Sequence, residues 1–151
     1  MGKRVFGPIG WEHWRWDENP PEPNGARHTK AQGGIKPRPR DALRFGYLHL
    51  RSGRWKDRQV VPAWYAAAMR RPSDYNCIHQ NYGLQVGLNA GGRAAQAPTD
   101  GYGAVGFADN YIYVVPSLDM VAVRIGGRDN ARAREHVWGD ILEKVVAAAV
   151  D

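Results

Sequence analysis

Three serines and a single cysteine are the first candidates for a covalent nucleophile in this 151-residue sequence. A serine becomes nucleophilic beside a base, and in one widespread arrangement that base is a lysine one helical turn later. The residues at that spacing are not lysines here: Ser52, Ser73 and Ser117 are followed three positions later by Trp55, Asn76 and Met120. We therefore identify no catalytic residue and expect no acyl transfer from these residues alone.

Metal and redox chemistry also lack a matching pattern. Cys77 is the only cysteine, which excludes an intrachain disulfide, and it has no Cys or His partner at zinc-ligand spacing. Gly101-Tyr-Gly103 lacks the remainder of a dinucleotide-binding fingerprint. The histidines show no His-x-x-x-His or Glu-x-x-His pattern, and they are His13, His28, His49, His79 and His136. The sequence predicts no metal site and no cofactor.

The chain is basic, with a formal net charge of +6. Its cations are densest in residues 36–40 and 51–58, and no nucleic-acid-binding motif accompanies them. We expect a solvated basic surface. A phosphate track is the less favoured alternative, in which Trp11, Trp14 and Trp16 would stack on single-stranded nucleic acid instead of fixing a loop to the core.

No apolar run approaches the roughly 18 residues that span a membrane. The first eight residues, Met-Gly-Lys-Arg-Val-Phe-Gly-Pro, lack the apolar core of a signal peptide. For the chain as given, the sequence predicts a cytoplasmic location and no membrane contact.

The pattern of elements predicts one α+β domain over residues 1–151. Prolines interrupt an irregular segment at 1–38, and helical spacing then indicates helices at 39–51 and 62–69. A short strand or turn is expected at 59–61, a strand at 82–88, an exposed connection at 89–100, and a last helix from about residue 130.

Residues 102–127 are the strongest strand signal. Tyr111, Tyr113 and Val115 alternate with Ile112 and Val114, so both faces of this strand are apolar. Such strands occur in sheets that are covered on both sides. Residues 116–119, Pro-Ser-Leu-Asp, supply a tight turn before a second apolar strand. We therefore expect an antiparallel sheet with flanking helices.

Several short strings, taken in order, resemble the serine β-lactamase and penicillin-binding-protein-like hydrolases. Residues 39–48 match the pattern Pro-Arg-Asp-x-x-Arg-Phe-Gly-x-Leu. Residues 53–62 match the pattern Gly-x-Trp-x-x-x-x-Val/Ile-x-Pro. Tyr82-Gly83 then precedes a strand, and residues 106–121 match the family's strand, turn and hairpin. The resemblance implies a partial β-lactamase or transpeptidase-like fold.

In that family a Lys-Thr-Gly strand lines the substrate pocket, and it aligns with Ala104-Val105-Gly106. The resemblance therefore implies that Ala104, Val105, Gly106 and Phe107 bind substrate, with the Phe107 N–H in the oxyanion position. Ala104 lacks the cation that would pair with a substrate carboxylate. The glycine has a second interpretation, a bulge or bend in a core strand.

The family's Ser-x-x-Lys and Tyr-x-Asn elements are missing, and in the family both precede this region. We therefore expect the C-terminal portion of a β-lactamase-like serine hydrolase that is inactive alone on ester or amide substrates. The alternative is a non-catalytic binding or scaffold module. The few charges in residues 120–125 predict pairing there with an N-terminal hydrolase half or a second copy, unless residues 1–40 cover that edge.

Overall fold

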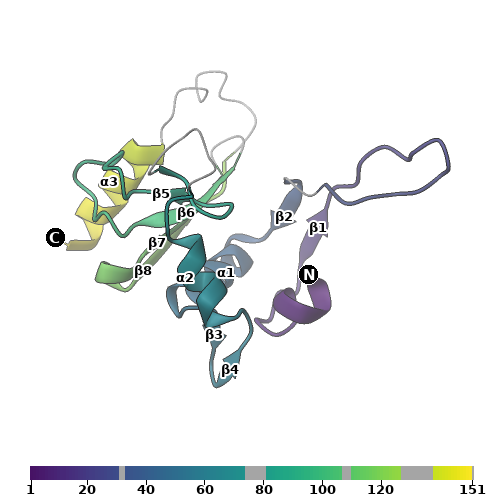
Figure 1. Cartoon of the computed structure of the whole chain (residues 1–151), viewed down its shortest axis with the longest axis horizontal. Coiled ribbons are helices and arrows are strands. Elements are labelled where there is room, and N and C mark those ends of the chain that lie inside the picture. Colours follow the sequence, from purple (N-terminus) through teal and green to yellow (C-terminus); the bar gives the residue numbers. More distant parts are fainter. Residues whose placement is uncertain (31–32, 74–80, 107–109, 127–137, 151) are drawn as a thin grey trace.

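A four-stranded antiparallel sheet is the largest sheet of the described residues, which are 1–30, 33–73, 81–106, 110–126 and 138–150 of a computed structural model (Figure 1). The strands are adjacent in the order β5-β6-β7-β8. Their bounds are Gly87–Leu88 for β5, Tyr102–Gly106 for β6, Asn110–Val115 for β7 and Met120–Arg124 for β8. With the helices around it, this sheet confirms the α+β class.

The turn between β7 and β8 is built as its residue types predict. It contains the short helical turn η3 (Pro116–Leu118), in which proline fixes the first backbone angle. Asp119 then adopts the left-handed conformation at φ 48°, which Asp tolerates better than most residues. The turn is also fixed from outside, because the Asp100 carboxylate accepts hydrogen bonds from the N–H of Ser117 at 2.7 Å and from its hydroxyl at 2.9 Å.

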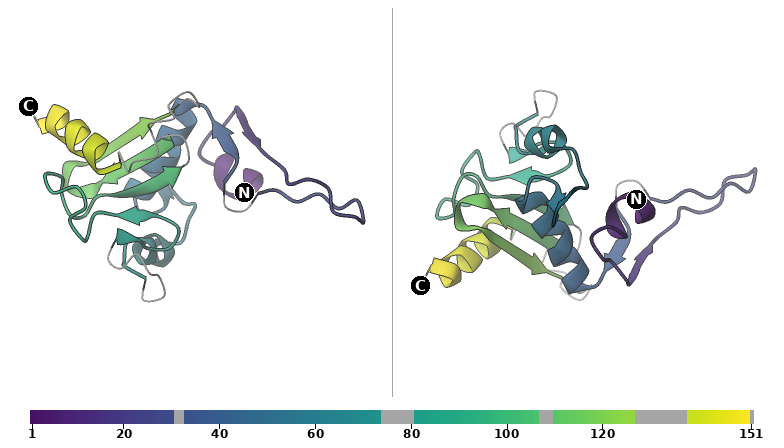
Figure 2. Two further views of the ribbon diagram at one scale, coloured as in Figure 1. Left: turned by 90° about the horizontal axis from the view of Figure 1, so that it is seen from above. Right: turned by 90° about the horizontal axis from the view of Figure 1, so that it is seen from below.

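Helices cover both faces of the sheet, as the two apolar faces of β7 predict (Figure 2). Tyr111, Tyr113 and Val115 pack in one buried cluster with Leu142 and Val146 of α3 (Trp138–Val150). On the opposite face lies α1 (Pro39–Leu50). There the sheet meets Gly46, whose missing side chain leaves room for the methyl groups of Val121 and Ile112.

A small unit follows α1 along the chain. The two-residue strands β3 (Arg54–Trp55) and β4 (Arg58–Gln59) form a hairpin, and α2 (Ala63–Met69) comes next. The predicted strand or turn at 59–61 is thus the end of this hairpin. Met69 anchors α2 in a buried cluster with Val86, Leu88, Tyr102 and Val114.

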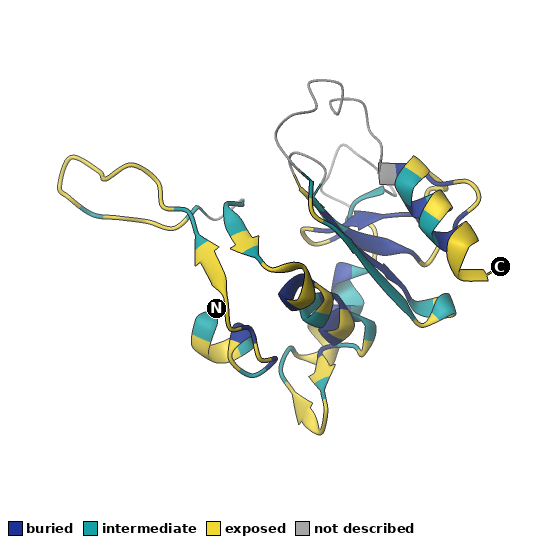
Figure 3. Cartoon of the chain, turned by 180° about the vertical axis from the view of Figure 1, so that it is seen from behind, coloured by how far each residue is buried: buried dark blue, intermediate teal, exposed yellow. Residues whose placement is uncertain are grey.

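The segment 1–38 is more regular than predicted. It contains a short helix η1 (Gly2–Phe6) and an antiparallel pair of strands, β1 (Trp14–Trp16) and β2 (Ile35–Pro37). Residues 17–30 of the connection between these strands project away from the rest of the protein, and most of them are exposed (Figure 3). Pro20, Pro21 and Pro23, which suggest an irregular segment, lie in that projecting connection, outside the strands.

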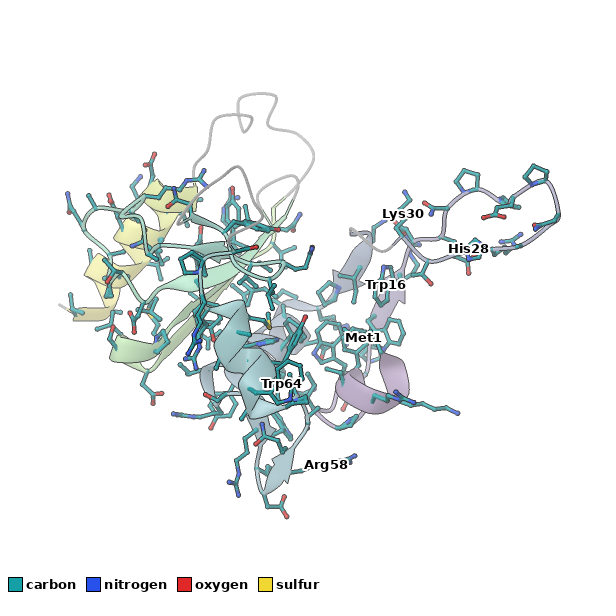
Figure 4. All side chains as sticks on the ribbon, in the orientation of Figure 1. Met1, Trp16, His28, Lys30, Arg58 and Trp64 are labelled. Carbon is teal, nitrogen blue, oxygen red and sulfur yellow. The ribbon has the colours of Figure 1, made fainter. Side chains whose placement is uncertain are left out.

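Aromatic side chains tie this N-terminal unit to α1. The rings of Phe6 and Trp11 stack with centroids 4.1 Å apart, and Trp11 meets Phe45 of α1 edge-on at 6.1 Å. The Trp16 indole N–H lies within hydrogen-bond distance of the carbonyls of Lys30 and Gly33, both at 2.9 Å, at the base of the projecting connection (Figure 4). These contacts confirm for Trp11 and Trp16 that the rings fix the segment in place, whereas Trp14 is 40% exposed.

Most other predicted elements appear, with changed lengths. The helices at 39–51 and 62–69 are confirmed within a residue. The strand predicted at 82–88 is reduced to β5 with one bridge from Tyr82 to Gly87, because Gln85 turns the chain at φ 63°. The last helix is confirmed from Trp138, and its predicted start near residue 130 lies outside the described residues. Within the described ranges, none of the helices has the length and apolar character needed to cross a bilayer.

Candidate functional site

The second half of β6 carries the predicted substrate-binding residues. Ala104, Val105 and Gly106 pair in regular register with Ile112, Tyr111 and Asn110 of β7. Ala104 is half-buried, Gly106 is exposed and Val105 is 45% exposed, so this end of the strand lies at the surface of the sheet. The regular pairing shows that Gly106 does not form a bulge. A side chain there would place its first carbon 2.9 Å from the Asn110 carbonyl oxygen.

On its other side, β6 has no strand partner along the same residues in the part of the chain that the structure describes. β5 pairs with β6 only through Gly87 and Gly103 and through Leu88 and Tyr102. Beyond Gly103, no strand in the described part of the chain continues the ladder on that side. Gly87 allows β5 to lie close to β6, because a first side-chain carbon at that position would lie 2.9 Å from a methyl group of Val105.

An open strand edge offers backbone N–H and C=O groups to an extended ligand. Such a ligand can bind as an added strand, with its main chain supplying affinity. Residues 104–106 could hold an extended acyl or peptide group in this way. Phe107, the predicted oxyanion donor, lies outside the described residues, and its role stays a prediction.

Two of the three serines lie among partners that do not activate a nucleophile. The Ser52 hydroxyl oxygen lies 3.4 Å from the Arg70 guanidinium, and the Ser117 hydroxyl donates to the Asp100 carboxylate. Neither arrangement supplies a neutral lysine or histidine to take the serine proton. Of the residues described, no group of three or more His, Cys, Asp or Glu side chains could hold a metal ion; Cys77 and His79 lie outside them.

A cavity of about 220 Å³ lies at the opposite end of β6, beside Tyr102. Nearby, the Tyr102 hydroxyl donates to the carbonyl of His49 at 3.0 Å, and burial raises the pKa of Tyr102 to about 12. Burial and then the charge of Arg70 lower the pKa of His49 to about 4. No local sequence motif predicts this cluster, because its members come from α1, the end of α2 and β6.

Comparisons with known proteins show the fold and not a family. No protein-family model matches the sequence, and no curated protein matches it. Among solved structures, a protein from Bacteroides dorei DSM 17855 named "putative beta-lactamase" superposes with a TM-score of 0.66 at 16% sequence identity. The superposition covers 98% of this chain and 49% of that one, so the present chain spans about half of its neighbour's length. The likeness establishes a β-lactamase-like fold.

Proposed function

We propose that this chain forms the C-terminal half of a β-lactamase-like serine hydrolase that cleaves esters or amides through an acyl-enzyme. The observation that carries the proposal is the edge of β6 at Ala104-Val105-Gly106, which no described strand covers, within a fold that matches half of a β-lactamase-like structure. The serine nucleophile and its basic partner would come from residues outside these 151, either on a second chain or on a longer parent.

The division of roles follows from the residues present. The open β6 edge binds the acyl part of the substrate, and the Phe107 N–H stabilises the oxyanion that forms on its carbonyl. Ala104 replaces a cation, so a neutral substrate fits this strand better than one with a carboxylate. Preorganised donors of this kind contribute roughly 10² to 10³ in rate, which is useful only beside an activated nucleophile.

Complementation tests the proposal. The purified chain is mixed with a separately expressed N-terminal half of a related hydrolase that contains Ser-x-x-Lys, and cleavage of a neutral chromogenic ester is followed. We expect no burst or turnover from either part alone and turnover from the mixture. A stable mixture without turnover would contradict the hydrolase assignment and favour the scaffold alternative.

Two glycine variants sharpen the test. Gly106→Ala places a methyl group against the backbone of Asn110 at the open edge, and we expect the turnover of the mixture to fall at least tenfold. Gly33→Ala is the matched control, because apart from its chain neighbours no atom of the described residues lies within 4 Å of the added carbon there. Equal turnover of the two variants would remove Gly106 from the site.

A further inference from the structure

The cavity at the beginning of β6 carries charges that the proposed hydrolase function does not use. Arg70 and Asp100 line it together with an apolar wall formed by Leu88, Ala90, Pro116 and the ring of Tyr102. The strand rises about 3.3 Å per residue, so Tyr102 lies about 13 Å from Gly106. The cavity is therefore separate from the open edge of β6, and its function is independent of the hydrolase proposal.

Arg70 is half-buried, and within the described residues it has no anionic partner. It lies 5.9 Å from the centre of the Tyr102 ring, and its second nitrogen is 3.4 Å from the Ser52 hydroxyl. Among the described residues no carboxylate lies within ion-pair distance of it. A cation partly withdrawn from water gains most from a ligand that brings a carboxylate, which accepts two parallel hydrogen bonds from arginine.

The Asp100 carboxylate is held in place and retains binding capacity. Ser117 donates to both of its oxygens, which fixes the orientation of the group. A carboxylate offers about four lone-pair positions, so each oxygen can accept a further bond. Asp100 and Arg70 line one cavity without forming an ion pair with each other.

We infer that this cavity binds a small zwitterion of the α-amino-acid class. The ligand carboxylate lies on the Arg70 guanidinium, the ammonium group lies on Asp100, and an apolar side chain lies against Leu88, Ala90 and Pro116. A simple anion would meet the repulsion of Asp100, and a simple cation that of Arg70. A volume of 220 Å³ is below the range of about 300 to 1,000 Å³ of drug-sized sites, which limits the ligand to a small molecule.

The Tyr102 hydroxyl takes no direct part. It already donates to the carbonyl of His49, so the ring contributes a flat apolar wall on which the arginine lies. Recognition therefore depends on the two opposite charges and on shape.

Ligands that each lack one charge test the inference. Binding of L-valine to the 151-residue chain is measured by calorimetry and by NMR, beside isovalerate, which lacks the ammonium group, and isobutylamine, which lacks the carboxylate. We expect saturable binding of L-valine and at least tenfold weaker binding of each analogue. No saturable binding of L-valine, or equal binding of isovalerate, would overturn the inference.

Variants locate the site. Hydrogen bonds to charged groups are worth enough that Arg70→Gln and Asp100→Asn should each weaken L-valine binding about ten- to a hundredfold. Arg71→Gln is the matched control, since this neighbouring arginine is exposed and does not line the cavity. Circular dichroism confirms that each variant is folded. Unchanged binding in Arg70→Gln or in Asp100→Asn would contradict the assignment.

Discussion

His49 is a titratable side chain buried near the end of α1, with only 7% of its surface exposed. Its Nε2 atom has no hydrogen-bond partner in the described structure, and its ring meets Phe45 edge-on at 4.6 Å. Burial first, and the positive charge of Arg70 second, lower its pKa from 6.5 to about 4. The folded protein therefore holds this imidazole neutral where the unfolded chain would bind a proton.

This difference predicts a pH dependence of stability. Between pH 6.5 and about 4 the unfolded state binds more protons, so the contribution of His49 is complete above pH 6.5 and is lost as the pH falls toward 4. The full loss is about 3 kcal/mol. Urea unfolding across this range measures it. In His49→Phe, which keeps a ring and removes the titration, the free energy of unfolding should fall less steeply with acid; an unchanged slope would contradict the prediction.

The effect of the Arg70 charge on the His49 pKa can be separated from the effect of burial. Arg70→Gln removes the charge and leaves the imidazole buried, so the His49 pKa should rise while staying below 6.5. NMR titration of the imidazole carbons measures this shift, with Arg71→Gln as control. A His49 pKa that does not change in Arg70→Gln would assign the whole effect to burial.

Asn89 fixes the connection between β5 and β6. Its side chain is fully buried; the amide nitrogen lies 3.0–3.1 Å from the carbonyls of Ala94, Ala97 and Pro98, and the amide oxygen accepts from the N–H of Ala94 at 2.7 Å. Asn89→Ala leaves these buried backbone groups unsatisfied, so the free energy of unfolding should fall by about 3 kcal/mol. Urea denaturation tests this, with the exposed Asn24→Ala, which loses one local bond to Ala26, as control. Equal losses would contradict the role given to Asn89.

At the scale of elements, α1 lies directly on the sheet because of a glycine. At Gly46, an added carbon would collide with a methyl group of Val121 and lie 2.9 Å from one of Ile112. Gly46→Ala should raise helix propensity and yet destabilise the protein, by about 1 to 3 kcal/mol, because the helix must move away from the strands. Thermal unfolding beside Gly33→Ala, where the added carbon meets nothing, measures the difference. A more stable Gly46→Ala would show that this contact is loose.

The helices and strands that the sequence predicts correctly are those determined by residues within the element itself. Pro39 begins α1, apolar residues at helical spacing follow, and the alternation in β7 predicts a sheet covered on both sides. Pairing partners are not local. The residues near Trp14 in the sequence do not indicate that it pairs with Pro37. The residues near Val86 do not indicate that β5 contains only Gly87 and Leu88.

The candidate site likewise has one part that the local sequence predicts and other parts that only the fold reveals. The strand 104–106 was predicted from a string of residues, and the structure places those residues at an exposed strand end. Among the described residues, β6 lacks a strand partner on one side there because β5 is short, and the sequence does not indicate that length. The cavity beside Arg70 depends on three separate elements and could be found only from the fold.

At the scale of the whole molecule, the outermost strand of the sheet remains available. β8 pairs with β7 on one side, and the hairpin of β1 and β2 forms a separate sheet, so within the described residues no strand covers the other side of β8. Its residues are half-buried and Arg124 is its only charge. Natural edge strands usually carry charge, proline or a cover against pairing with other chains.

We therefore expect the chain to self-associate, or to bind the N-terminal hydrolase half proposed above, by adding a strand beside Met120–Arg124. Light scattering after size-exclusion chromatography should show a dimer in the micromolar range when no partner is present. Val123→Lys, and Ile125→Lys at an exposed position beside the strand, should shift the chain toward monomer, because a charge at an edge opposes pairing. Leu43→Lys, on the exposed surface of α1, is the control and should leave the dimer intact. A monomer at all concentrations, with the amides of residues 120–124 protected from hydrogen exchange, would mean that part of this chain covers the edge.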